Sequence, residues 1–107
     1  MSKKTILANP RINPARWGIK RIVRELKDYP TLVFLLNGKT VKGDLDLRGT
    51  KITSLPEGLK VGGNLYLENT PITSLPEGLK VGRHLDLEGT PITSLPEGLK
   101  VGRDIFR

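Results

Sequence analysis

VGGNLYLENTPITSLPEGLK, residues 61–80, is the middle of three consecutive copies of one twenty-residue sequence. The first copy is VKGDLDLRGTKITSLPEGLK (41–60), the third is VGRHLDLEGTPITSLPEGLK (81–100), and a fourth begins as VGRDIFR at Val101. A fixed period of this length is typical of a solenoid, in which each unit buries its apolar face against its neighbours. The sequence therefore predicts a short solenoid of about three and a half coils.

The copies share their secondary-structure signals, which the middle copy illustrates. Leu65–Leu67 alternates inward and outward residues and predicts a strand with both leucines buried. Asn69, which is glycine in the other two copies, belongs to the residue types that best tolerate positive φ, so a left-handed turn is expected there. We expect the hydroxyl of Thr70 to bond the backbone of a neighbouring coil where the strand ends. Pro76–Gly78 predicts a second turn.

The shared pattern, L-x-L-x-x-T-x-I-x-x-L-P-x-x-L, resembles the leucine-rich repeat, and its period with Leu-Pro resembles the short subtype of bacterial and phage proteins. The resemblance covers about residues 31–107. It implies an α/β repeat fold with a parallel sheet on one side of a curved solenoid, irregular chain on the other, and a role in recognition. Two departures stand out: threonine replaces the asparagine usual at the strand end, and Lys42, Gly62 and Gly82 replace a usual leucine.

The net charge of +7 is concentrated near the N-terminus. Residues 1–40 contain nine Lys and Arg against two Asp and Glu, a balance of +7, whereas residues 41–107 contain nine of each kind and balance to zero. A partner that recognises positive charge is therefore expected at the N-terminal segment.

An amphipathic helix is predicted between Asn13 and Asp28. Asn13 is a suitable N-cap, a proline follows at the first helical position, and Pro30 prevents continuation. Basic residues fall on one side and apolar residues recur at helical spacing on the other, namely Trp17, Ile19, Ile22, Val23 and Leu26. We expect the helix to cap the apolar edge of the first coil. The chain thus divides into a basic extended arm with a capping helix (1–30) and the solenoid (31–107).

The segment Leu32–Val41 has two interpretations. Asn37-Gly38 between apolar runs is a hairpin signal. The leucines and the glycine of this segment also share the offsets of Ile52–Gly58 in the first copy, with Leu35 at the offset of Leu55. We favour a degenerate half-coil in which Asn37-Gly38 makes the turn, with the hairpin as the alternative.

Outward positions of the predicted strands stack into three columns about 4.8 Å apart from coil to coil. They are Asp44, Asn64, His84 and Asp104; Asp46, Tyr66, Asp86 and Phe106; and Arg48, Glu68 and Glu88. The second and third copies differ at four positions, all in or beside the strand, and are identical at the other sixteen. These columns predict a mainly acidic protein-binding face with Tyr66 and Phe106 as anchors for a basic partner. Solvated carboxylates that keep a sheet soluble are the alternative.

A non-enzymatic protein–protein interaction module is the predicted function, as a subunit or accessory protein of a larger bacterial or phage assembly. It would bind through the sheet face, the uncapped C-terminal strand edge and the basic arm; self-association through that edge is a further expectation. Nucleic-acid binding to phosphates is the alternative, through basic residues of the arm and helix: Lys3, Lys4, Arg11, Arg16, Lys20, Arg21, Arg24 and Lys27.

Other classes of function find little support in the composition. The chain has no cysteine and a single histidine, and the serines of the repeats belong to the convex side, away from His84, so no catalytic residues, metal site or cofactor is predicted. The longest apolar run, Leu32–Leu36, is too short to cross a membrane, and no signal-peptide pattern follows Met1. We therefore expect a cytoplasmic protein, or part of a particle assembled inside the cell.

Overall fold

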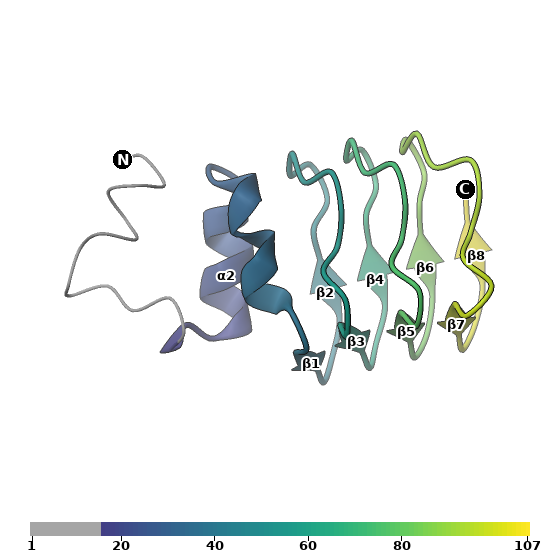
Figure 1. The fold of residues 1–107 in the computed structure, drawn as a ribbon, viewed down its shortest axis with the longest axis horizontal. Helices are drawn as coiled ribbons and strands as arrows, with labels where there is room; N and C mark the ends of the chain where they lie inside the picture. Colours follow the sequence, from purple (N-terminus) through teal and green to yellow (C-terminus); the bar gives the residue numbers. More distant parts are fainter. Residues whose placement is uncertain (1–15) are drawn as a thin grey trace.

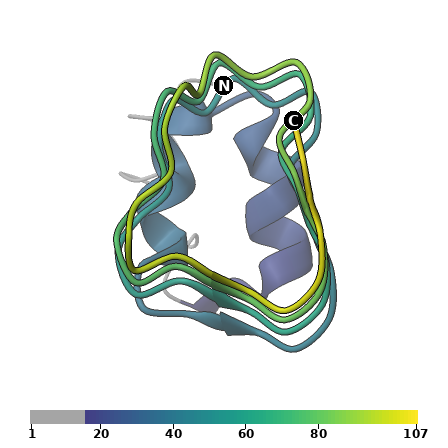
Figure 2. The same cartoon turned by 90° about the vertical axis from the view of Figure 1, so that its right-hand side faces the viewer.

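The structure, a computed structural model, describes residues 16–107. Helix α2 (Ile19–Leu26) and the 3-10 helix η2 (Pro30–Leu36) lie side by side at one end of a stack of coils (Figure 1). Viewed along the stack, the coils superimpose and the two helices lie behind them (Figure 2). The molecule is therefore a solenoid of stacked parallel strands with an N-terminal helix.

Each coil contributes two short strands, one to each of two parallel sheets. One sheet contains β1 (Thr40–Val41), β3 (Lys60–Val61), β5 (Lys80–Val81) and β7 (Lys100–Val101); the other contains β2 (Leu45–Asp46), β4 (Leu65–Tyr66), β6 (Leu85–Asp86) and β8 (Ile105–Phe106). Each strand of one coil pairs with its counterpart in the next coil, twenty residues further along. The prediction of a single sheet is wrong, because the residues before each Gly-rich bend also form an inter-coil ladder, as in the bond from the Lys60 N–H to the Lys39 carbonyl (3.0 Å).

One apolar core runs from the helices through the coils. Its members recur at the inward positions of each copy, as in Leu65, Leu67 and Ile72, which are all 0% exposed. The last coil is less covered: Ile92 is partly buried, although it occupies the position of Ile72, and Ile105 is 36% exposed. Coverage by a following coil therefore decides how deeply a repeated residue is buried.

Helix α2 is shorter than the sequence predicts. It begins at Ile19 with Gly18 as N-cap in an extended conformation (φ −76°, ψ 170°), so the predicted continuous helix from Asn13 to Asp28 is wrong at Trp17 and Gly18. Glycine disfavours a helix interior, and no side chain caps this start. Asn13 itself lies outside the described residues. Trp17 is 8% exposed and joins the core, with the Arg21 guanidinium 4.6 Å above its ring.

The segment after the helix forms η2 and no hairpin. Leu32 and Leu36 are buried, and Leu35, the predicted counterpart of Leu55, is only partly buried because the 3-10 helix turns it outward. The half-coil register holds from Gly38 onward: its φ is +68°, and its N–H donates to the Glu57 carbonyl at 3.1 Å. The turn at Asn37-Gly38 is thus confirmed.

The predicted turn at Asn69 and the predicted hydrogen bond of Thr70 have different outcomes. Asn69 has φ +58° and its glycine counterparts have φ +72°, so the left-handed turn is confirmed. The predicted inter-coil bond of Thr70 is wrong: its hydroxyl donates to the Leu67 carbonyl of its own coil at 2.8 Å. The next coil's backbone is already engaged at this level, as in the bond from the Asn69 N–H to the Glu88 carbonyl (2.9 Å).

Glycine is required where the coils approach most closely. A Cβ on Gly62 would lie 2.6 Å from the Lys42 carbonyl oxygen. A Cβ on Gly82 would meet the carbonyl oxygen of Gly62 and lie 2.8 Å from its carbonyl carbon, and Gly102 stands against Gly82 in the same way. Lys42 occupies this position in the first coil, which has no repeat before it. The stacking explains why a side chain is found at Lys42 and not in the later copies.

Candidate protein-binding face

The predicted columns lie on the outward side of the β2–β4–β6–β8 sheet. Asp46, Tyr66, Asp86 and Phe106 are in register on adjacent strands. We call this surface the acidic face, and it comprises Asp44, Asp46, Arg48, Asn64, Tyr66, Glu68, His84, Asp86, Glu88, Asp104 and Phe106. The structure therefore brings the predicted residues of the second column together, and it shows that they differ in how far they are already engaged within the chain.

The first column is an inter-coil ladder of side chains bonded to backbone. Asp44 Oδ1 accepts from the Asn64 N–H at 2.7 Å, and Asn64 Oδ1 accepts from the His84 N–H at 2.8 Å. His84 Nδ1 accepts from the Asp104 N–H at 3.2 Å. The signal for this role in the sequence is that Asp44, Asn64 and His84, at one repeated position, can all accept a hydrogen bond. These side chains hold successive coils together and are less available to a partner than the sequence suggests.

Asn64→Ala tests this ladder. We expect it to lower the free energy of unfolding by about 1–2 kcal/mol, because the His84 N–H would lose its acceptor. Urea denaturation followed by circular dichroism measures the change. Asn64→Asp is the matched control, since Asp44 makes the same bond one coil earlier, and it should lose less. Equal losses for the two variants would contradict the ladder.

At the N-terminal end of the acidic face, the charged groups satisfy one another. Arg48 donates to both carboxylate oxygens of Asp46, at 2.9 and 2.7 Å, and this bonding lowers the pKa of Asp46 and raises that of Arg48. The guanidinium lies 5.0 Å from the Tyr66 ring centre, and the Tyr66 hydroxyl accepts from Asn64 Nδ2 at 2.9 Å. Tyr66 is thus held by its own chain, and its predicted role as a free anchor is weakened.

Carboxylates crowd the middle of the acidic face. Partial desolvation raises the pKa of Glu68 above its ordinary value of 4.5, and the neighbouring Asp86, which shares a hydrogen bond with it, raises it further. The charge of Glu88 adds to the effect, while Arg48 opposes it. The negative charges of Glu68, Asp86 and Glu88 therefore repel one another in the folded protein.

Glu68→Gln is expected to raise the melting temperature slightly at pH 7. A raised folded pKa means that Glu68 favours the folded state when protonated, below about pH 4.5, and that this contribution is lost as pH rises through the folded pKa. The gain of the variant should therefore shrink as pH falls and vanish below pH 4.5, where both side chains are neutral. Thermal melts across this range measure it; a gain that persists at low pH would contradict the charge origin.

The C-terminal end of the acidic face carries its exposed apolar surface. Phe106 is 42% exposed, and its ring centre lies 5.4 Å from that of His84. His84 Nδ1 also lies 3.7 Å from the Asp104 carboxylate. An exposed aromatic ring beside carboxylates can contact a partner that combines apolar and basic side chains.

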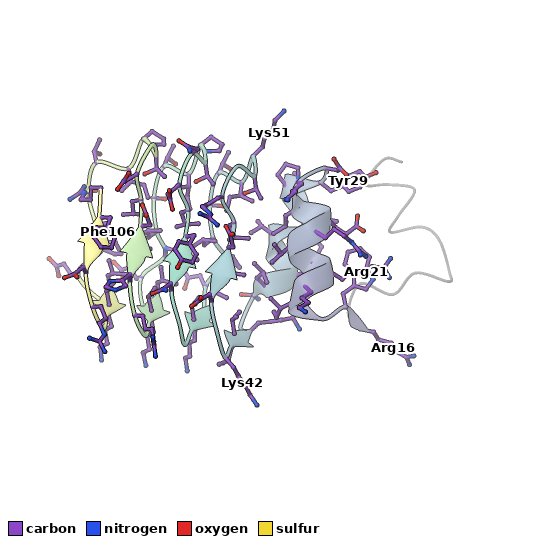
Figure 3. The ribbon with its side chains drawn as sticks, turned by 180° about the vertical axis from the view of Figure 1, so that it is seen from behind. Arg16, Arg21, Tyr29, Lys42, Lys51 and Phe106 are labelled. Atoms are coloured by element: carbon purple, nitrogen blue, oxygen red, sulfur yellow. The ribbon has the colours of Figure 1, made fainter. Side chains whose placement is uncertain are left out.

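The predicted nucleic-acid residues lie elsewhere. Arg16, Lys20, Arg21, Arg24 and Lys27 are exposed at the helical end of the molecule; Lys3, Lys4 and Arg11 lie outside the described residues. Arg16 and Arg21 point away from the coils (Figure 3), whereas Lys27 is near enough to Asp46 to contribute to the lowering of its pKa. The basic residues of the helix therefore do not all face one way.

Within residues 16–107, no group of three or more His, Asp and Glu side chains is arranged to hold a metal ion. In the same part of the chain, no helix is long and apolar enough to cross a lipid bilayer. Ser54, Ser74 and Ser94 are exposed on the part of each coil that forms no strand.

No protein-family model matches the chain, and comparisons with curated proteins and with solved structures find no match either. Its function is therefore inferred from the chemistry of its own surface.

Proposed function

We propose that the chain is a protein-binding module of the leucine-rich-repeat type whose acidic face binds a basic partner. One observation carries the proposal: Glu68, Asp86 and Glu88 crowd together, and the exposed Phe106 is in register with Asp86 on the neighbouring strand. Among the described residues, no Lys or Arg forms an ion pair with these three carboxylates; the Arg48 ion pair is with Asp46.

The repeat pattern supports the finer assignment. Leucine or isoleucine fills the inward positions of successive coils, and the Leu-Pro turn recurs at a twenty-residue period. Repeat proteins of this shape present extended surfaces to other proteins. A subunit or accessory protein of a larger bacterial or phage assembly is the role that the short subtype suggests.

The partner's chemistry follows from the acidic face. An arginine or lysine placed between Glu68 and Asp86 would relieve their repulsion, which raises the pKa of Glu68 in the free protein. An apolar side chain next to it would cover Phe106. Binding should therefore lower the pKa of Glu68 and favour segments that carry basic and apolar residues together.

A random peptide library screened on the whole chain tests the proposal. We expect selected peptides to be rich in Arg and Lys next to an apolar residue, and Phe106→Ala to weaken their binding roughly tenfold, as loss of an interface anchor does. Ser94→Ala is the control. Ser94 is exposed on the part of the coil that forms no strand, so this variant should bind as the unmodified chain does. Peptides without basic residues, or equal binding by Phe106→Ala, would overturn the proposal.

A further inference from the structure

The other sheet carries a row of lysines on its outward side. Thr40, Lys60, Lys80 and Lys100 are in register on adjacent strands, and the three lysines are exposed while the valine after each of them points inward. Strands in a sheet are about 4.8 Å apart, so the three lysines span roughly 10 Å along the solenoid axis. This row is a straight array of positive charges.

More cations flank the row. Lys39 and Lys42 lie beside β1, and Arg83 and Arg103 lie in the bends after β5 and β7. We call the seven residues the lysine edge: Lys39, Lys42, Lys60, Lys80, Arg83, Lys100 and Arg103. Glu57, Glu77 and Glu97 precede the row in the turns, and Asp44 and Asp104 follow Lys42 and Arg103 in the bends, so seven cations less five carboxylates leave two positive charges. The lysine row thus lies on one sheet and the acidic face on the other.

The row borders a hollow of about 620 Å³ that extends over all four strands of the sheet. Its lining includes the lysines and the backbone of Gly62, Gly82 and Gly102. These glycines leave the floor bare because the coils stack too closely there for a side chain. Figure 3 shows nitrogen-tipped side chains along this edge as far as Lys42, with Arg16 beyond it, whereas Lys51 lies at the opposite edge. An elongated ligand could therefore lie along the solenoid.

The lysine row is electrostatically unfavourable for the free protein. Like charges on adjacent strands repel, and among the described residues none of these lysines has an acidic group within ion-pair distance. The third copy adds a further positive charge, since Arg83 stands where the second copy has Gly63. A ligand with regularly spaced negative charges would relieve the repulsion.

We propose that the lysine edge binds the phosphate backbone of duplex nucleic acid, laid along the solenoid axis. The three lysines span roughly 10 Å, a length over which duplex nucleic acid carries several phosphates, at one per ~3.4 Å of helix axis on each strand. The exposed large apolar residues of the described chain are Phe34, Ile105 and Phe106, and none lines the hollow, so the edge offers no ring for stacking on unpaired bases. Five of its seven cations are lysines, which are depleted in protein–protein interfaces. Nucleic acid therefore fits better than an acidic protein.

Fluorescence anisotropy of a labelled, mixed-sequence DNA duplex with the whole chain tests the proposal. We expect binding that weakens steeply from about 50 to 200 mM salt. A Lys60→Gln, Lys80→Gln double variant should bind more weakly, and the slope of log affinity against log salt should fall by about two. Lys51→Gln with Arg107→Gln removes the same charge away from the edge and should leave the slope unchanged.

Three results would overturn the proposal: no duplex binding at low salt, equal loss in both double variants, or binding to polyglutamate or single-stranded DNA at least as tight as to the duplex. The first two remove the site, and the third assigns it to another ligand. The lysine edge and the acidic face lie on different sheets, so Phe106→Ala should leave duplex binding unchanged. The failure of one proposal therefore does not decide the other.

Discussion

Replacing Gly82 by alanine is expected to lower the free energy of unfolding by roughly 3 kcal/mol. The added Cβ would meet the backbone carbonyl of Gly62, and a backbone group in a hydrogen-bonded coil cannot move aside as a flexible side chain can. The Gly82 N–H donates to the Val61 carbonyl at 2.7 Å, so any shift that relieves the contact also disturbs the ladder between the coils. Urea denaturation monitored by circular dichroism measures the loss.

Gly43→Ala is the matched control for this experiment. Gly43 lies in the corresponding bend of the first coil, and a Cβ there would have no atom within 4 Å. Its stability should therefore change by no more than about 0.5 kcal/mol. If Gly82→Ala were as mild as Gly43→Ala, close stacking would not be the reason for glycine at this position.

Replacing Ile72 by alanine is expected to lower the free energy of unfolding by about 3–4 kcal/mol. Ile72 is 0% exposed between two neighbouring coils, so its truncation leaves a cavity that the stack cannot close without shifting whole coils. Small domains have few kcal/mol in reserve, and this loss would be a large share of the total. Thermal and urea unfolding of the purified variant measure it.

Ile92→Ala separates the contribution of coverage from that of local sequence. Ile92 stands in the same stretch as Ile72, TPITSLPEGLK, but no complete coil covers it and it is only partly buried. We expect its truncation to lower the free energy of unfolding by about 1 kcal/mol, because the space left by the side chain is open to solvent and forms no closed cavity. Equal losses at the two positions would mean that the last coil is covered in solution, for example by a second copy of the chain.

Much of the fold is predictable from the repeat. The twenty-residue period sets the register of every strand pair, because residues at equal offsets in identical units meet equivalent neighbours. Leu65, Leu67 and Ile72 are inward as their alternation predicts, and Asn69 adopts the positive φ that its residue type favours. The column from Asp46 to Phe106 lies in register for the same reason.

The start of the helix and the threonine bonds were not predictable in this way. Gly18 interrupts a pattern whose apolar spacing still looks helical, and backbone propensity decides the outcome. Thr70 bonds its own coil because the partners in the next coil are already engaged. The partner of the Thr70 hydroxyl therefore depends on backbone groups of the next coil, which the sequence of one repeat does not reveal.

The period, the inward residues and the turns follow from the amino-acid sequence alone, since each depends on the conformational preferences and polarity of a few neighbouring residues. The tertiary structure decided which groups meet between coils: the ladder from Asp44 to Asp104, the bare glycine floor beside Gly82, and the separation of the lysine edge from the acidic face. The physical reason is that these features arise from close approach of chains twenty residues apart, where a carbonyl leaves no room for a side chain and like charges gather on one side of a coil.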